Sequence, residues 1–208
     1  MKAARGARDG ARQLPLDSVP ARGCHPAPLG ECFRIARVPQ LSLHTPVGDV
    51  TVSEEDGRIV ALDWGWGRDQ TETDLLCRAR EQLHGYFDGR CPGFDLPLAP
   101  QGSPYRRRVW QALQAIPPGQ TRTYQEIARI AGGSARSVGG ANAANPIPIL
   151  IPCHRVVATG GIGGYSGGDG LSTKRYLLEH ETRMLASQQP PCRPLNARSQ
   201  PLDMMEHP

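Results

Sequence analysis

The chain has 208 residues, of which 38% are hydrophobic and 21% charged, and its formal net charge is +4. This length allows one domain or two small domains with a buried core. The chain has no run of about 18 apolar residues, and its basic N-terminus lacks the apolar core of a secretory signal, so we expect neither a membrane span nor secretion. Six cysteines without metal-type pairs favour a reducing compartment, which is the cytoplasm or, in a eukaryotic cell, the nucleus.

Charge is distributed unevenly along the chain. Residues 41–100 carry five basic and eleven acidic side chains, whereas residues 101–182 carry nine basic and four acidic ones. A polyanion would therefore be attracted to the second half of the folded region. Charge alone does not distinguish a nucleic-acid-binding surface from an ordinary basic one.

The two ends of the chain differ in composition from the middle. Residues 1–38 are rich in Arg, Ala, Gly and Pro and contain few large apolar residues. Residues 186–208 are similarly rich in Pro, Gln, Arg and Ser. Segments of this kind bury too little apolar surface to fold. We expect a disordered basic N-terminal extension and a disordered C-terminal tail.

Residues 39–100 are predicted to form a small α/β domain and its linker. The alternating pattern over residues 41–67 predicts a short strand meander, with turn residues between the strands. The apolar spacing within residues 71–89 predicts one helix. Residues 94–100 are interpreted as the linker to the second half of the chain.

Residues 101–185 are predicted to be mainly helical. Ser103, followed by proline, opens one helix, and Thr123 with Glu126 three residues later forms a capping box that opens a second. Ser134 can cap a third helix. The last two helices are short and are joined through glycines, which is typical of a helix-turn-helix motif, although an ordinary helical hairpin fits the same pattern.

The third predicted helix is built from small residues. Gly139 and Gly140 lie in its interior, where each glycine costs about 1 kcal/mol relative to alanine. Two such glycines predict a close approach of this helix either to another helix or to a nucleic-acid backbone. Arg136 lies in its first turn, an unfavourable place for a cation beside the helix dipole. It is either a solvated surface arginine or a residue of a DNA-recognition helix.

A cysteine and a histidine are adjacent in the stretch IPCHRV. Cys153 follows the apolar run 146–151, which is interpreted as a buried strand, and a cysteine in that place is most often inert packing. A thiol with a pKa of about 8.5 needs a nearby base or cation to react efficiently at neutral pH. His154 could supply the base directly or through water. Glu181, on the buried side of the helix predicted for 173–183, could orient the imidazole as in a catalytic triad.

Several segments resemble one protein family in order and spacing. The run ANPIPILIPCHRVV resembles the active-site signature of the O6-alkylguanine-DNA alkyltransferases, and ARSVGGANAANP resembles their recognition helix and asparagine hinge. The segments TRTYQEIA, GYSGG and KRYLLEHE are similar to the family's preceding helix, active-site loop and glutamate-bearing helix. The resemblance covers residues 41–182. The turn GGSAR is shorter than in the commonest family version. The loop GGDGLSTK is longer than in many relatives, and because this loop would border the pocket, the range of accepted alkyl groups is left open.

The resemblance implies a fold, an activity and a partner. The fold would be α+β, with a small N-terminal α/β (ribonuclease H-like) domain and a mainly helical C-terminal domain that carries a winged-helix or helix-turn-helix DNA-binding motif. The activity would be that of a single-turnover methylated-DNA–protein-cysteine methyltransferase, with O4-alkylthymine as a secondary substrate. The partner would be double-stranded DNA containing O6-alkylguanine, bound by a monomer. We expect no cofactor and no metal, because His44, Cys77 and Cys91 make no convincing ligand set.

The resemblance also implies roles for particular residues. The catalytic residues would be Cys153 as the alkyl acceptor, together with His154, Glu181 and Tyr124. The DNA contacts would come from Tyr124, Ser134, Ala135, Arg136 and Gly139. The substrate pocket and its support would be formed by Asn145, Pro148, Arg155, Val156, Tyr165 and Ser166.

Three other functions compete with this interpretation. A non-catalytic helix-turn-helix regulator or lesion sensor would bind DNA and leave Cys153 unmodified. A cysteine hydrolase would need a direct thiolate–imidazolium contact, which adjacent Cys and His rarely allow, and no oxyanion hole is evident. A phosphate-binding loop is suggested by GGIGGYSGGDG, but the segment lacks both the GK[ST] ending and a complete G-x-G-x-x-G.

Overall fold

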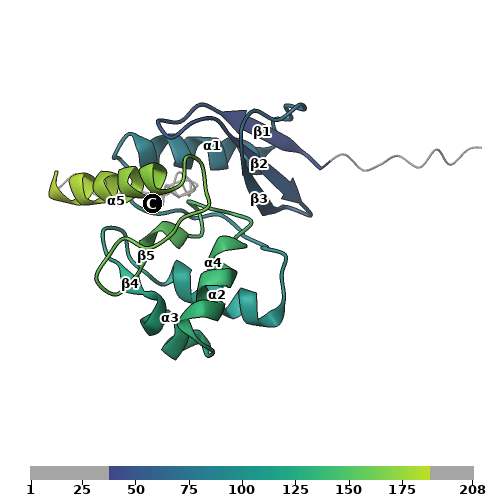
Figure 1. The fold of residues 1–208 in the computed structure, drawn as a ribbon. Coiled ribbons are helices and arrows are strands. Elements are labelled where there is room, and N and C mark those ends of the chain that lie inside the picture. Colours follow the sequence, from purple (N-terminus) through teal and green to yellow (C-terminus); the bar gives the residue numbers. More distant parts are fainter. Residues whose placement is uncertain (1–37, 188–208) are drawn as a thin grey trace, which may run out of the picture. The chain divides into compact units, whose positions relative to one another are not determined.

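The computed structural model describes residues 38–187 (Figure 1). Nearly all of the predicted disordered extension and of the predicted tail, namely residues 1–37 and 188–208, lies outside the described residues. In the described part, a small sheet with one helix is followed by a mainly helical region, so the mixed α/β class with an N-terminal sheet domain is confirmed. No helix in this part is long and apolar enough to cross a membrane.

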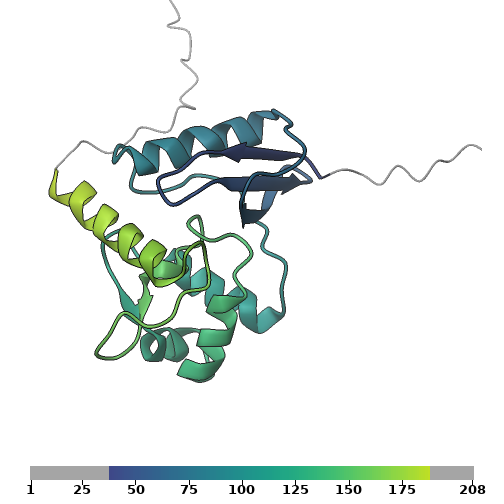
Figure 2. The same ribbon diagram turned by 45° about the horizontal axis from the view of Figure 1, so that its top comes forward.

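The N-terminal domain is an antiparallel meander covered by one helix. Strands β1 (Gln40–Leu43), β2 (Val50–Glu55) and β3 (Arg58–Trp64) pair in chain order. The two residues between β2 and β3, Asp56 and Gly57, both have positive φ, as a tight hairpin turn requires. Helix α1 (Asp74–Phe87) begins at the cap Thr73 and packs along the sheet, as Figure 2 shows. The predicted meander and helix are confirmed.

The segment interpreted as a linker pairs with the sheet. The backbone N–H of Ile59 donates to Pro97 O at 2.8 Å, and the N–H of Ala99 donates to Ile59 O at 2.8 Å. The free edge of β3 presents unpaired donors and acceptors that a passing extended segment can satisfy. Residues 97–99 therefore bridge to the sheet edge at Ile59, within the segment interpreted as a linker.

The helical region follows the predicted caps. Helix α2 (Pro104–Gln114) begins after Ser103, α3 (Tyr124–Ala131) has the predicted capping box, and α4 (Ala135–Ala143) is capped by Ser134. The three helices pack on one another around Trp110, whose indole N–H donates to Ala141 O at 2.8 Å.

The turn between α3 and α4 requires glycine at its second position. Gly133 has φ of 92°, which L side chains rarely adopt, and a Cβ there would lie 2.7 Å from both Tyr105 Oη and Ser137 Oγ. Those two oxygens are themselves 2.7 Å apart and join the first turns of α2 and α4. The turn is therefore shaped by close contacts with α2 as well as by its own residues.

The apolar run before Cys153 is not a strand. Residues 146–151 form buried turns in which only Pro148 and Ile151 make a bridge, and Ile149 has φ of 70°. Pro146 and Pro148 lack the N–H groups that a strand would use, so the run cannot extend a ladder. The prediction of a strand here is wrong, although the prediction of burial is confirmed.

After these turns, the chain forms a short strand pair with the segment that precedes α3 and then the last helix. A 3₁₀ turn, η1 (Cys153–Arg155), leads into β5 (Val156–Val157), which pairs in parallel with β4 (Arg122–Thr123). After a glycine-rich loop, α5 (Leu171–Ala186) closes the described chain.

We predict that Thr123→Ala destabilises the protein by about 1 kcal/mol, because it removes the acceptor for the Glu126 N–H and half of the capping box. Urea unfolding followed by circular dichroism measures the change. The matched control is Thr182→Ala, since Thr182 is exposed on α5 and bonds only back to Leu178 O. Equal stability of the Thr123→Ala protein and the wild type would contradict the prediction.

Candidate active site

Cys153 begins the η1 turn and is buried. Its N–H donates to Ile151 O at 2.8 Å, which turns the backbone sharply after Pro152. Burial raises the pKa of the Cys153 thiol, and the polar groups of Asn145 and Tyr165 and the charge of Lys174 act in the opposite direction. The hydroxyl of Tyr165 makes no hydrogen bond of standard geometry with a described residue, so its effect on the thiol is that of a nearby dipole. A buried thiol of this kind reacts efficiently only with help from a base.

His154 and Glu181 form a buried pair. His154 Nε2 lies 2.8 Å from Glu181 Oε1, and both side chains are 0% exposed. An ionised carboxylate only accepts hydrogen bonds, so Nε2 carries the proton and Nδ1 of the neutral ring is an acceptor. Burial lowers the pKa of His154, whereas the bond to Glu181 raises it, and the net shift is downward. The Nδ1 atom of His154 is buried and has no hydrogen-bond partner among the described residues. It is therefore a free acceptor on the residue that directly follows Cys153.

Glu181 is held by more groups than the sequence indicated. Tyr86 Oη donates to Oε1 at 2.9 Å, and the N–H of Gly119 donates to Oε2 at 2.9 Å. Arg155 donates from Nε at 3.1 Å to each oxygen and from Nη2 at 2.8 Å to Oε1. Burial alone would raise the pKa of Glu181, but the bonds and charges of His154 and Arg155 outweigh it and lower the pKa to about 2. The carboxylate is therefore ionised throughout the physiological range.

Arg155 supports the carboxylate of Glu181. Its guanidinium contacts Glu181 and, through Nη1, the Ile116 carbonyl. Tyr86 and Gly119 were missed by sequence reasoning. Gly119 follows two prolines and has φ of 69°, a turn signal that does not reveal its partner. An aromatic residue on the apolar face of α1 gives no sign of a bond to a residue 95 positions away.

Two asparagines connect α4 with the cysteine segment. Asn145 donates from Nδ2 to Ile151 O at 2.9 Å and accepts at Oδ1 from the N–H of Ile147 at 3.1 Å. Asn142, which was not predicted, donates to Cys153 O at 3.2 Å from the buried side of α4. Pro148 lies in the turns that these bonds enclose. The position of Cys153 therefore depends on the position of α4.

The glycine-rich loop is closed by a buried lysine. Lys174 is 0% exposed, and its Nζ donates to Val156 O at 2.5 Å and to Gly164 O at 3.0 Å. Burial lowers the pKa of Lys174 to about 8. This lysine therefore joins β5 to the middle of the glycine-rich loop, residues 158–170, a role that the sequence did not indicate.

Three further predicted residues either belong to this loop or contact it. Tyr124 Oη, from α3, donates to Gly164 O at 3.4 Å, and Ser166 Oγ donates to Ala143 O at 3.4 Å. Tyr165 lies between Gly164 and Ser166 in the chain and is partly buried. Burial and the nearby Cys153 raise the pKa of Tyr124, so its hydroxyl remains a proton donor at neutral pH.

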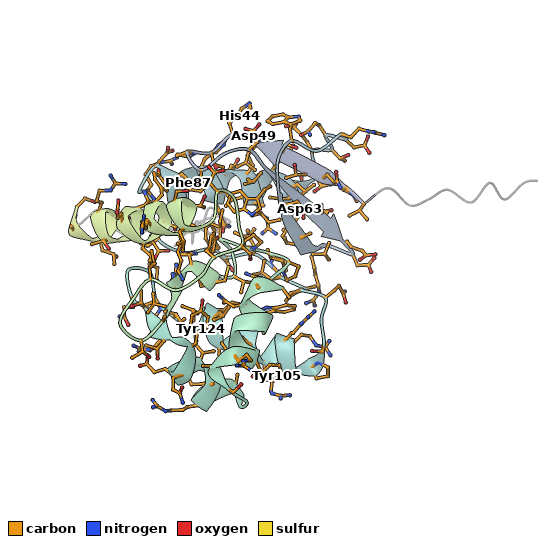
Figure 3. All side chains as sticks on the ribbon, viewed as in Figure 1. His44, Asp49, Asp63, Phe87, Tyr105 and Tyr124 are labelled. Atoms are coloured by element: carbon orange, nitrogen blue, oxygen red, sulfur yellow. The ribbon has the colours of Figure 1, made fainter. Side chains whose placement is uncertain are left out.

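Helix α4 presents an open face. Val138, Ala141 and Asn142 are buried, whereas Ser134, Arg136 and Gly140 are exposed. A Cβ placed on Gly139 or Gly140 would meet nothing within 4 Å, so the protein's own packing does not require glycine at either position. Exposed arginines also lie on the neighbouring helices α2 and α3, which carry Tyr105 and Tyr124 (Figure 3). These arginines are Arg106, Arg107, Arg108 and Arg129.

Metal ligands do not cluster in residues 38–187. No group of three or more His, Cys, Asp and Glu side chains in this range could hold a metal ion. His44 instead pairs with Asp49, with Nδ1 and Oδ1 2.6 Å apart (Figure 3), and its ring lies tilted against that of Trp66, with the centroids 4.6 Å apart.

The geometry defines a class of protein, one that holds a buried thiol beside a histidine–carboxylate pair. Hydrogen bonds tie the segment that carries the thiol to a helix with an open face of small residues. Two family models match this chain, the ribonuclease-like domain of 6-O-methylguanine DNA methyltransferase over residues 41–100 and its DNA binding domain over residues 104–183. The chain belongs to the 6-O-methylguanine DNA methyltransferase family.

Individual relatives agree with the family models. The chain is 39% identical over 151 residues to the constitutive methylated-DNA–protein-cysteine methyltransferase of Bacillus subtilis, an alignment that covers 66% of this chain and 91% of the relative. It is 53% identical over 108 residues to the enzyme of the same name from Mycolicibacterium paratuberculosis, covering 50% and 64%. A crystal structure of Mycobacterium tuberculosis OGT in complex with DNA is similar with a TM-score of 0.64 and 37% identity, covering 71% of this chain and 94% of that one.

We predict that the Glu181 carboxyl titrates near pH 2, compared with an ordinary value of 4.5. Because the pKa is lower in the folded state, its contribution to stability is complete above pH 4.5 and is lost as the pH falls towards 2. The shift corresponds to about 3 kcal/mol. The ¹³Cδ chemical shift of Glu181, with urea unfolding at each pH, measures both quantities.

Two variants identify this contribution. Glu181→Gln should lose the acid-dependent step, whereas Glu126→Gln, which removes a half-buried capping carboxylate, should retain it. A Glu181 midpoint close to 4.5 would show that the buried bonds to His154 and Arg155 do not stabilise the charge as described.

Proposed function

We propose that this protein repairs DNA by moving the alkyl group of O6-alkylguanine irreversibly onto Sγ of its own Cys153. The observation that carries the proposal is the buried Cys153 beside the His154–Glu181 pair, in a segment that Asn142 and Asn145 bind to α4. Family membership supports the same reaction, since the relatives are named methylated-DNA–protein-cysteine methyltransferases and one solved relative is bound to DNA.

The reaction is a single displacement. Nδ1 of His154 takes the thiol proton of Cys153 through a bridging water, and Glu181 stabilises the resulting imidazolium. The thiolate attacks the alkyl carbon, a carbon–sulfur bond forms, and the bond between that carbon and O6 breaks with its electron pair passing to the guanine. Tyr124 donates a proton to the departing base and recovers one from solvent. A thioether is stable, so each molecule reacts once.

DNA binding is assigned to α3 and α4 as a helix-turn-helix motif in a winged-helix-like domain. The target guanine is flipped out of the duplex, and Arg136 fills the space it leaves, which offsets part of the unstacking cost of a few kcal/mol. Ser134, Ala135 and Gly139 allow the α4 backbone to approach the minor groove. Exposed arginines on α2 and α3 add attraction to the phosphates.

The substrate pocket is assigned to the loop that Lys174 closes. Tyr165 and Ser166 wall the pocket, while Val156, Pro148 and Asn145 support it from the cysteine segment. O4-alkylthymine is a secondary substrate of the same pocket. The acting unit is a monomer in the cytoplasm, with residues 39–100 as the ribonuclease H-like domain and residues 101–185 as the catalytic, DNA-binding one.

We predict that a duplex carrying one O6-methylguanine methylates the protein once, on the peptide that contains Cys153. Intact-protein and peptide mass spectrometry measure the stoichiometry and the position. Cys153→Ser should bind the duplex and remain unmodified. Cys77→Ser removes the other cysteine that is free in residues 38–187, so it is the matched control and should react like the wild type.

The same experiment separates this function from the regulator or lesion sensor. A wild-type protein that binds the methylated duplex and leaves Cys153 unmodified would contradict alkyl transfer and favour the sensor. A duplex with unmodified guanine controls for non-specific modification.

We predict that Gly139→Ala stabilises the fold by up to about 1 kcal/mol and weakens duplex binding several-fold. The added methyl meets nothing within 4 Å in the protein and favours the helix, but it occupies the space that the DNA backbone would take. Urea unfolding and fluorescence anisotropy measure the two effects. Stabilisation without loss of affinity would place the DNA on another surface.

A further inference from the structure

One donor to the Glu181 carboxylate comes from the sheet domain. Tyr86 lies in the last turn of α1, is 0% exposed, and donates from Oη to Glu181 Oε1 at 2.9 Å. The backbone of the same residue is held by the neighbour of Glu181, because His180 Nε2 lies 2.7 Å from Tyr86 O. Two consecutive residues of α5, His180 and Glu181, therefore hydrogen-bond to the end of α1.

Tyr86 and His154 contact the same carboxylate oxygen, Oε1 of Glu181. His154 Nε2 and Arg155 Nη2 each lie 2.8 Å from Oε1, while Arg155 Nε lies 3.1 Å from both carboxylate oxygens. Arg155 could therefore hold the carboxylate in more than one orientation. Tyr86 on Oε1 and the N–H of Gly119 on Oε2 each bind a single oxygen, and together they fix the plane of the group.

We propose that Tyr86 is a positioning residue for the alkyl transfer, whose hydroxyl keeps Oε1 of Glu181 on His154 so that the sheet domain takes part in activating Cys153. The inference rests on the proposed function, because it assigns a further residue to the same site. Without the hydroxyl, the carboxylate turns towards Arg155, its bond to His154 weakens, and the histidine becomes a poorer base for the thiol.

Tyr86 is suited to this task at every physiological pH. Burial, followed by the charge of Glu181, raises its pKa well above the ordinary value of 10, so the hydroxyl keeps its proton and always donates. The ring is fixed by Phe87, Phe94 and His180, each with its centroid 5.2 Å away. The other titratable or charged groups around the site are His154, Arg155, Tyr165, Lys174 and His180.

The test is Tyr86→Phe, with carboxymethylation of Cys153 by iodoacetate as a readout that needs no DNA. We expect the pH of half-maximal carboxymethylation to rise by up to about one unit, and methyl transfer from O6-methylguanine DNA at pH 7 to slow about tenfold, the effect of losing one hydrogen bond to a charged group. Affinity for an unmodified duplex should not change. In a Glu181→Gln background, the same substitution should have no further effect on the carboxymethylation profile.

The matched control is Phe87→Leu. Phe87 is the next residue on α1 and packs on Tyr86 and His180, so its truncation loosens the same contact without removing the donor. A structural role alone predicts equal changes in the carboxymethylation profile for Tyr86→Phe and Phe87→Leu, or no change for Tyr86→Phe, and either result would overturn the inference.

The role of Tyr86 can still be decided if the wild type does not react or if the variant does not fold. If wild-type protein fails to take the methyl group, the proposed function fails, yet the carboxymethylation profiles still decide whether Tyr86 acts on the thiol. If Tyr86→Phe does not fold, the ¹³Cζ signal of Tyr86 in the wild type is followed before and after carboxymethylation of Cys153. A shift supports the coupling, and an unchanged signal contradicts it.

Discussion

The buried carboxylate of Glu181 is the constraint on which the arrangement of the site depends. A charge removed from water is tolerated only when hydrogen bonds and opposite charge replace its hydration. Five donor atoms do so here, and they come from α1, from the turn after α2 and from η1. Because all of them must converge on α5, the sheet domain, the helical region and the cysteine segment cannot shift independently without leaving the charge unsatisfied.

The same bonds determine the chemistry of the thiol. Since Glu181 stays ionised, His154 must donate from Nε2, and its Nδ1 remains an acceptor in the protein interior. Burial keeps the ring neutral, which is the form that can take a proton. Burial and pairing thus shift the pKa values of the two groups in opposing directions. The result is a carboxylate that does not titrate near neutral pH beside an imidazole that can accept a proton.

Helix α4, to which we assign DNA binding, shows the opposite arrangement. One side of α4 contributes to the core and, through Asn142, to the carbonyl of Cys153, while the other side carries glycines with free space above them. Those glycines weaken the helix without improving the packing of the protein. Departures of this kind from local stability are expected at functional surfaces, where the compensating contact comes from the partner.

The sequence by itself determined the local features, namely the caps at Ser103, Thr123 and Ser134 and the hairpin turn at Asp56-Gly57, because each depends on a few neighbouring residues. Its resemblance to a known family also brought Cys153, His154 and Glu181 together. Only the tertiary structure decided that residues 97–99 bridge to the sheet edge at Ile59, that residues 146–151 turn instead of extending, and which groups surround the carboxylate. The physical reason is that the bonds of Tyr86, Gly119, Asn142 and Lys174 join residues distant in the chain, and hydrogen-bond geometry of that kind leaves no periodic signal in a sequence.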